Sequence, residues 1–211
     1  MQKAHEGNAA AVSESDEELS KAFNSRLAGY RYSIDLRCSP RELLRWLSLE
    51  QRLSRDEGKE SIQFRTVQRA IQEAVEGCRR VKVHARLGLL LDMPDRGWVP
   101  FGVLSDGQRN VVAMIGDLAF KAAQLNPHLG ERVLTETPGV VLIDELDLHL
   151  HPHWQRHIAE DLRRTFPALQ FIVTTHSPFI VQSARDGEII ALDAQPVDKT
   201  AGLGKIGRAH V

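Results

Sequence analysis

Residues 139–152 read GVVLIDELDLHLHP, and this stretch decides the expected fold. The run from Val140 to Ile143 is apolar at every position, which is typical of a strand buried on both faces of a parallel sheet. Asp144 and Glu145 follow this run directly and are therefore expected at the end of the strand. One carboxylate there can hold a hydrated Mg²⁺ ion, and the next can polarise an attacking water. An acidic pair that merely leads a strand into a polar loop fits these residues equally well, so the interpretation depends on the neighbouring motifs.

The chain after this stretch alternates between helices and strands. Pro152 is expected to open a helix and Pro167 to end it. The buried side of that helix is expected to carry Trp154, Ile158 and Leu162. A second buried strand follows at residues 170–174, then a short helix at 178–184 and a strand at 188–192. Such alternation predicts an α/β fold with a parallel sheet and functional side chains at the carboxyl ends of its strands.

Before the quoted stretch, the sequence predicts helices and a hairpin. Leucine spacing predicts a helix that Pro40 opens, and a second helix begins near Ser61. Residues 79–104 first alternate and are rich in valine, and they continue through a PDRGW turn, which predicts a hairpin. A longer helix is expected from about Asp106 to Leu125, because the stretch NPHLGERVLTETPG then breaks the helical pattern.

Residues 103–110, VLSDGQRN, stand at the start of that longer helix. Ser105 supplies a hydroxyl group, and Gly107 allows a ligand to approach the backbone closely. The amino end of a helix carries about half a positive charge, which favours a phosphate there. A serine N-cap followed by a turn glycine explains the same residues without any ligand.

Residues 171–181, FIVTTHSPFIV, run a buried strand directly into the polar side chain of His176. A histidine alone at a strand end is more often a hydrogen-bonded structural residue than a catalytic one. Here it follows two other motifs, and each of the three lies at a strand end or a helix start. Three such motifs in this order make a chance arrangement improbable.

In this order the three motifs resemble the signature, the Walker B motif and the switch histidine of ABC-type ATPases. The signature of that family is LSGGQ, and here Asp106 stands in place of its first glycine. The segments LIDELDLHLHP and TTHSP are more similar to the RecF, SMC and OLD-like group, which includes the Septu-type anti-phage ATPases, than to transporter subunits. The resemblance extends over residues 23–193.

The resemblance implies a role for each residue of the two strand ends. Asp144 would hold Mg²⁺ through water, and Glu145 would be the catalytic base. His176 would sense the γ-phosphate of ATP.

The resemblance also implies residues that act across a dimer interface. These are Ser105, Gly107 and Gln108 of the signature, which would contact the γ-phosphate bound by the partner protomer. Family members carry a D-loop that ends in aspartate. The matching positions here include His149 and His151, with His151 at the place of the aspartate, so the function of that aspartate is in doubt in this chain.

The implied fold is α/β, a parallel-sheet P-loop NTPase lobe with a helical subdomain inserted before the signature helix. We expect a flexible lead-in at residues 1–22, a helical lobe plus hairpin at 23–102 and an ABC ATPase lobe at 103–204. The implied function is hydrolysis of ATP, with Mg²⁺, by a cytoplasmic homodimer that closes around ATP. The implied context is DNA repair or anti-phage defence, with DNA or an associated nuclease as a further partner.

The phosphate-binding loop of this family, G-x-x-x-x-G-K-S/T, does not occur in the sequence. Gly-Lys pairs at residues 57–61 and 202–207 lack both the earlier glycine and the following Ser or Thr. We therefore expect the chain to be the C-terminal portion of a longer ATPase and to be inactive alone. Residues 205–211 end in IGRAHV, which a common sequencing adapter can encode, so a non-native tail is expected there.

Two other hypotheses remain open. The chain could be a nucleotide-free adaptor or regulatory fragment. It could also be a metallohydrolase, because His149, His151 and His153 alternate and His157 lies one helical turn after His153, and such spacings can bind Zn²⁺. Pro152 bends the chain between these histidines, which counts against a shared metal ion.

The overall composition excludes several classes of protein. With 27 basic and 28 acidic residues the net charge is −1, so any nucleic-acid contact would need a local basic patch. Cys38 and Cys78 are too few for a disulfide scaffold, and we expect reduced thiols. The sequence contains neither a signal peptide nor a run of about 18 apolar residues, so we expect neither secretion by that route nor a membrane span.

Overall fold

The computed structural model describes residues 40–58, 60–84, 86–148, 150–192 and 209–210. The expected lead-in at residues 1–22 lies outside this part of the chain, as do His149 and most of the expected tail at 205–211.

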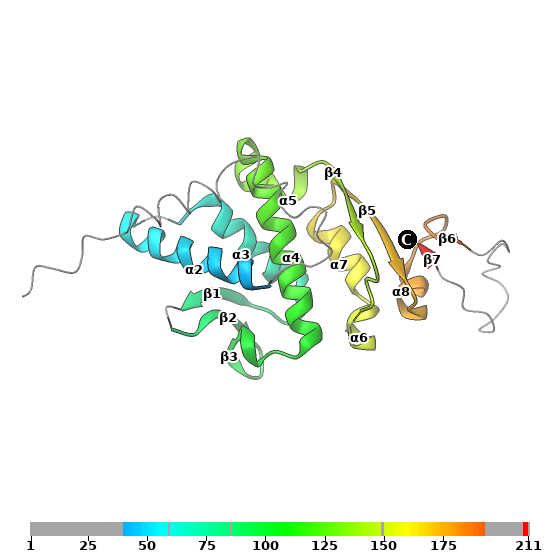
Figure 1. The fold of residues 1–211 in the computed structure, drawn as a ribbon, viewed down its shortest axis with the longest axis horizontal. Coiled ribbons are helices and arrows are strands. Elements are labelled where there is room, and N and C mark those ends of the chain that lie inside the picture. The colour runs from blue at the N-terminus through cyan, green and yellow to red at the C-terminus, as the bar shows by residue number, and fades with distance from the viewer. Residues whose placement is uncertain (1–39, 59, 85, 149, 193–208, 211) are drawn as a thin grey trace, which may run out of the picture.

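The elements follow the order that the sequence predicts, with some differences in length (Figure 1). The helices are α2 (Pro40–Glu57), α3 (Ile62–Ala74), α4 (Asp106–Leu125), α5 (Val133–Glu136), α6 (Pro152–Gln155), α7 (Ile158–Thr165) and α8 (Pro178–Ser183), with 3-10 helices η2 (Phe101–Val103) and η3 (Pro127–Arg132). The strands are β1 (Arg80–His84), β2 (Gly88–Met93), β3 (Gly97–Pro100), β4 (Gly139–Ile143), β5 (Leu169–Thr175), β6 (Ile190–Ala191) and β7 (Ala209–His210).

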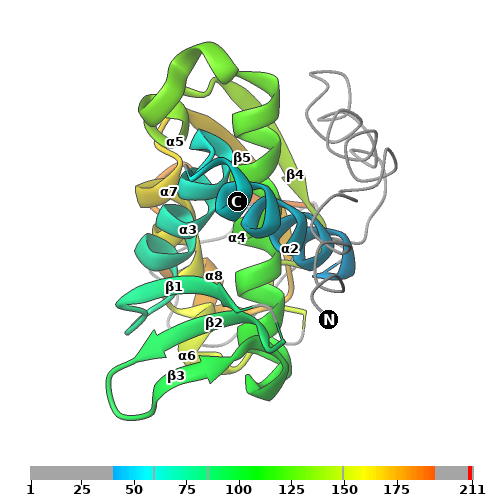
Figure 2. The ribbon, with the colours of Figure 1, turned by 90° about the vertical axis from the view of Figure 1, so that its left-hand side faces the viewer.

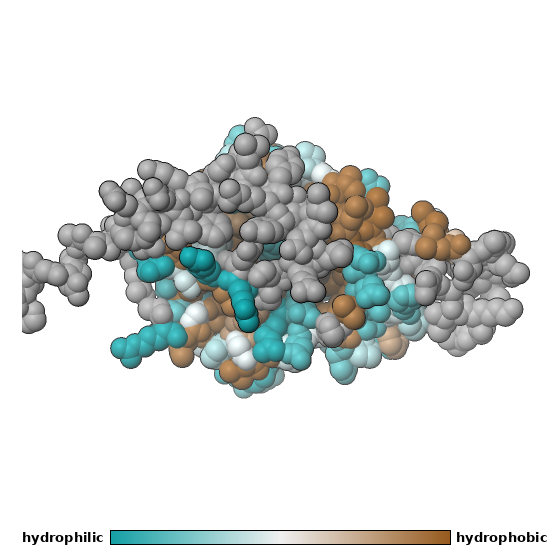
Figure 3. Space-filling view, viewed as in Figure 1, coloured by the Kyte–Doolittle hydropathy of each residue, from teal (hydrophilic) through white to brown (hydrophobic). Residues whose placement is uncertain are grey.

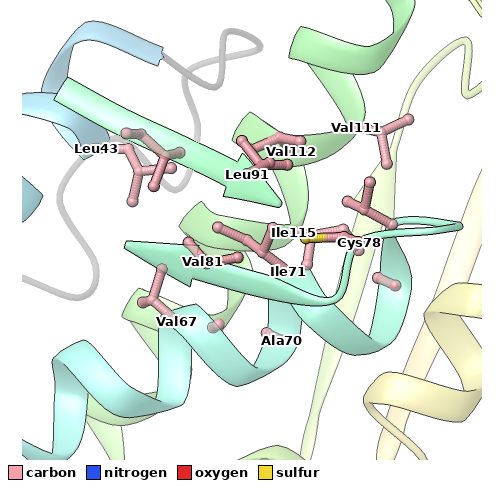
Figure 4. Close-up of a cluster of buried hydrophobic side chains, with 14 of the residues drawn as sticks. Leu43, Val67, Ala70, Ile71, Cys78, Val81, Leu91, Val111, Val112 and Ile115 are labelled. Carbon is pink, nitrogen blue, oxygen red and sulfur yellow. The ribbon is translucent and has the colours of Figure 1, made fainter. Parts of the chain in front are cut away.

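The first half of the chain packs α2 and α3 against the long helix α4, beside the antiparallel sheet β1–β2–β3 (Figure 2). Trp46 of α2 is fully buried, with its ring centroid 4.3 Å from that of Phe120 on α4. Figure 4 shows Ile71, Val81 and Ile115 meeting in the same core, although they come from α3, β1 and α4. Burial of these apolar faces against one another is what holds the helices and the small sheet together.

Cys78 belongs to this core as a buried free thiol (Figure 4). Desolvation by burial raises the pKa of Cys78 to about 11, so the thiol stays protonated at neutral pH. It therefore packs as a small apolar side chain and is a poor nucleophile.

The second half of the chain confirms the expected parallel pairing, since β4 and β5 run in the same direction with Val141 opposite Phe171 and Ile143 opposite Val173. These side chains point to one face of the sheet. Ile143, Phe171 and Val173 join the core cluster that also contains Ile158 of α7. That face is therefore covered by helices.

The other face of β4 and β5 is open, and the expectation that β4 is buried on both faces is wrong. Val140 is 59% exposed, Leu142 is 75% exposed and Ile172 on β5 is 43% exposed. Figure 3 shows the resulting apolar patch in the region where Figure 1 places these two strands. These exposed fractions mean that no described element covers this face of the two strands.

Two further expectations are wrong in detail. The strand expected at 188–192 is only Ile190–Ala191, and β7 lies between it and β5 in antiparallel pairing, so the sheet is mixed. A tight turn at residues 185–188 takes the place of the first part of the expected strand. In this turn the backbone N–H of Arg185 donates to the Glu188 carboxylate at 2.7 Å. The helix expected from Pro152 is split into α6 and α7, although Trp154, Ile158 and Leu162 are buried as expected.

No helix in the described residues is both long and apolar enough to cross a membrane. The core cluster runs through both halves of the chain, and the division into lobes at residues 102 and 103 stays a prediction.

Candidate functional site

The acidic strand end lies where β4 leaves the sheet. Asp144 and Glu145 follow Ile143 directly, and both are exposed. The Asp144 carboxylate accepts a hydrogen bond from the hydroxyl of Thr174 on β5, and that hydroxyl oxygen also accepts from the backbone N–H of Glu145 at 2.7 Å. The next residue, Leu146, is 5% exposed and its N–H donates to the Thr174 carbonyl at 2.9 Å. The two carboxylates are thus presented to solvent by a loop anchored on both sides.

Glu145 has an unusual backbone conformation. Its φ is 51°, and among the described residues no other non-glycine has a positive φ. The left-handed region costs a non-glycine residue about 1–2 kcal/mol, so the surrounding contacts must hold it there. Such strain collects at functional sites, because the geometry of the side chain is worth more than the lost stability. The conformation supports a functional role for this glutamate.

The strain can be measured without any ligand. Glu145→Gly is expected to raise the free energy of unfolding by about 0.5–1 kcal/mol, since relief of about 1–2 kcal/mol of strain exceeds the roughly 0.5–1 kcal/mol of extra chain entropy that glycine loses. Glu145→Ala removes the same side chain but keeps the Cβ atom, so it should not raise stability. Urea unfolding of both variants tests this. If alanine stabilises as much as glycine, the carboxylate rather than the backbone is the source of the cost.

His176 follows the end of β5, one strand away from the acidic pair. Its side chain is exposed. Its backbone N–H donates to Oδ1 of Asp147 at 3.0 Å, and the hydroxyl of Thr175 donates to the same oxygen. The following residue, Ser177, caps α8 by accepting from the N–H groups of Phe179 and Ile180. The parallel pairing of β4 and β5 therefore brings the predicted histidine and the predicted carboxylates to the same edge of the sheet.

Sequence reasoning missed the side chains that join these two strand ends. They are Asp147, Gln155, Thr174, Thr175 and Ser177. The Oε1 of Gln155 accepts from the Ser177 hydroxyl at 2.6 Å, and its Nε2 donates to the Leu150 carbonyl at 2.7 Å. Asp147 stands in the same DELD run as the predicted pair, but spacing alone does not say that it turns toward β5.

The signature residues form the start of α4, and the structure confirms the cap. Oγ of Ser105 accepts from the Gln108 N–H at 3.3 Å, and Oε1 of Gln108 accepts from the Ser105 N–H at 3.2 Å, which is a complete capping box. Gly107 is buried, and Asp106 forms an ion pair with Arg109 on the exposed side of the first turn. Contact with a phosphate stays a prediction.

The signature and the strand ends are separate within this chain. No hydrogen bond or ion pair among the described residues joins the Ser105–Gln108 turn to Asp144, Glu145 or His176. In Figure 1 the first turn of α4 and the carboxyl ends of β4 and β5 lie toward the same, lower side of the molecule.

The histidines of the predicted cluster that the structure describes, His151, His153 and His157, contact neighbouring groups. His151 caps α6 by accepting from the His153 N–H at 3.3 Å, and Nε2 of His153 lies 2.6 Å from Oε2 of Glu76, two residues after α3 ends. The rings of His153 and His157 have centroids 5.4 Å apart. Within the described residues, which leave out His149, no group of three or more His, Cys, Asp or Glu side chains could hold a metal ion.

The comparisons with known proteins agree with these motifs. A family model described as "AAA domain, putative AbiEii toxin, Type IV TA system" matches residues 10–182. The chain is 36% identical over 132 residues to "Retron Vc95 probable ATPase" of Vibrio cholerae serotype O1 biovar El Tor, covering 60% of this chain and 24% of that protein. It is 38% identical over 133 residues to "Retron Ec83 probable ATPase" of Escherichia coli, covering 62% and 24%. It is 38% identical over 96 residues to "Septu protein PtuA" of Bacillus thuringiensis, covering 46% and 24%.

The chain thus spans about a quarter of the length of these curated relatives. Among solved structures, one described under "ATP-driven dimerization and DNA stimulated activation of SMC ATPases" has a TM-score of 0.45 and 17% identity, covering 75% of this chain and 88% of that one. That likeness is too low to assign an activity.

Proposed function

The chain belongs to the AAA-domain family that matches residues 10–182, and from this premise we propose that it forms the carboxylate and sensor side of an ATP-hydrolysing site in an ABC-type ATPase. The observation that carries the proposal is the edge of the sheet, where neighbouring parallel strands end in Asp144, Glu145 and His176 and are tied together by Thr174. In parallel α/β sheets this edge is where ligands bind.

The residues present fit Mg-ATP. The exposed oxygens of Asp144 suit Mg²⁺, which prefers carboxylates and water, and the bound metal would neutralise phosphate charge. Glu145 would accept a proton from the attacking water. His176 would donate a hydrogen bond to the γ-phosphate.

The open face of β4 and β5 supports a site completed by another segment. Exposed Leu142 and Val140 lie on the same strand as the acidic pair, and an apolar patch of this kind marks an interaction site. We propose that a lobe carrying the phosphate-binding loop covers it. We call this chain joined to such a lobe the completed ATPase.

As the resemblance implies, the signature turn would then act in the second site of a homodimer, and no hydrogen bond or ion pair among the described residues joins it to the acidic pair of its own chain. Retron and Septu proteins are among the relatives, which favours anti-phage defence over DNA repair as the context. DNA or an associated nuclease is the proposed further partner.

A nucleotide-free adaptor is the second candidate function, because the same apolar patch could hold a partner protein. The metallohydrolase has less support, since His153 is engaged by Glu76 and the described residues contain no three-ligand group.

The isolated chain is expected to bind Mg-ATP more weakly than about 1 mM, since the lysine and backbone amides of a phosphate-binding loop are absent. The completed ATPase should bind it in the micromolar range. Isothermal titration calorimetry on both, with circular dichroism to show that the isolated chain is folded, tests this. Micromolar affinity of the isolated chain would contradict the proposal, and no affinity in the folded, completed form would favour the adaptor.

A further inference from the structure

The loops that leave β4 and β5 are held together by a polar clasp, which we define as Asp147, Thr175, Gln155 and Ser177. The paired register of the two strands ends at Ile143 and Val173, and beyond it one backbone hydrogen bond joins Leu146 to Thr174. We propose that Asp147 is a positioning residue, which sets the place of His176 relative to the acidic pair through this clasp. The proposal rests on the proposed function in so far as His176 is the phosphate sensor.

Asp147 makes two contacts with the loop that carries His176. Its Oδ1 accepts from the Thr175 hydroxyl and from the His176 N–H, the latter at 3.0 Å. Asp147 is half-buried, whereas the side chain of His176 is exposed. A hydrogen bond to a charged acceptor contributes a factor of about 10 to 100 to an equilibrium, more than a neutral pair does. This contact can therefore decide where the loop lies.

Gln155 holds the residue on the other side of the histidine. It accepts from the Ser177 hydroxyl at 2.6 Å and donates to the carbonyl of Leu150 at 2.7 Å, and a longer bond of 3.4 Å reaches the Asp147 carbonyl. The Ser177 N–H in turn donates to the Thr175 hydroxyl at 3.0 Å. Three consecutive residues, 175 to 177, are thus tied to the acidic loop or to α6.

This pattern is what a preorganised sensor requires. A side chain that must meet developing phosphate charge works best when its backbone is already fixed, because no reorganisation is then needed at the moment of reaction. The imidazole itself stays free to meet a ligand, while the main chain around it is held. The clasp also links the sensor to Glu145, whose strained backbone begins the same loop.

Amide hydrogen exchange of the isolated, nucleotide-free chain tests the position of His176. In Asp147→Ala the His176 amide should exchange about 10- to 100-fold faster, while amides of β1 and β2 stay unchanged. Asp147→Asn keeps an oxygen acceptor but loses its charge, so its His176 amide should exchange faster than in the unsubstituted chain and slower than in Asp147→Ala. Asp95→Ala, an exposed aspartate in the β2–β3 turn, is the matched control and should change nothing. Unchanged exchange at His176 in Asp147→Ala, or equal acceleration at all amides, would overturn the proposal.

In the completed ATPase, kcat and KM can distinguish a positioning role of Asp147 from a purely structural one. Asp147→Ala should lower kcat at least about tenfold with KM within about twofold, because the sensor acts in the transition state, and Asp147→Asn should recover most of the rate. If Asp147→Ala speeds exchange of the His176 amide but leaves kcat unchanged, the positioning role of Asp147 is overturned. Absence of turnover in the unsubstituted, completed protein overturns the proposed function instead.

Discussion

Glu145→Gln is expected to slow ATP turnover by the completed ATPase about 10²- to 10⁴-fold, the usual contribution of a positioned general base. Glutamine has nearly the same shape, so the loop should keep its conformation and ATP should still bind. Single-turnover hydrolysis and equilibrium binding of Mg-ATP, measured on the same preparation, separate the two effects. ATP-bound dimers should accumulate, because binding continues while hydrolysis does not.

Two further variants serve as comparisons for Glu145→Gln. Asp144→Asn should weaken the dependence on Mg²⁺ and the binding of nucleotide together, since it removes a metal-holding carboxylate rather than the base. Glu136→Gln on α5 changes an exposed glutamate that pairs with Arg132, and turnover should stay normal. If Glu145→Gln hydrolyses ATP at the normal rate, another residue is the base and the Walker B assignment is wrong.

Gly107→Glu is expected to abolish ATP-dependent dimerisation and hydrolysis while each completed monomer still binds ATP. The substitution places a bulky anion at the first turn of α4, where a γ-phosphate of the partner subunit would approach. Like charges facing each other across a desolvated interface cost several kcal/mol, or roughly 100-fold or more in association. Asn110→Glu adds the same charge one turn along the same helix and should dimerise normally. Size-exclusion chromatography with and without ATP provides the measurement.

Because Gly107 is buried, the fold of the variant must be checked directly by its unfolding midpoint. Gly107→Ala provides a milder form in which ATP-dependent dimerisation should be weakened in a folded protein. Mixing Gly107→Glu with a variant defective in the phosphate-binding loop should recover up to one working site per heterodimer, since each subunit supplies what the other lacks. Failure of that rescue in folded, mixed dimers would mean that LSDGQ serves only as a helix cap.

The sequence alone predicted several features that depend on neighbouring residues. The cap of α4 at Ser105 follows from a serine and a glutamine three residues apart, and the order of strands and helices follows from local periodicity and proline positions. The acidic pair after β4 and the histidine after β5 could be predicted as neighbours, because parallel strands bring their carboxyl ends to one edge.

Only the tertiary structure decided the features that depend on which segments pack together. The apolar run of β4 predicted burial on both faces, but burial requires a covering layer, and the described chain supplies one on a single face, so Leu142 is 75% exposed. The left-handed backbone of Glu145 is held by a threonine on another strand. Asp147 meets the amide of His176 across 29 residues of chain. Such contacts are set by the relative placement of two loops, and periodicity carries no information about that placement.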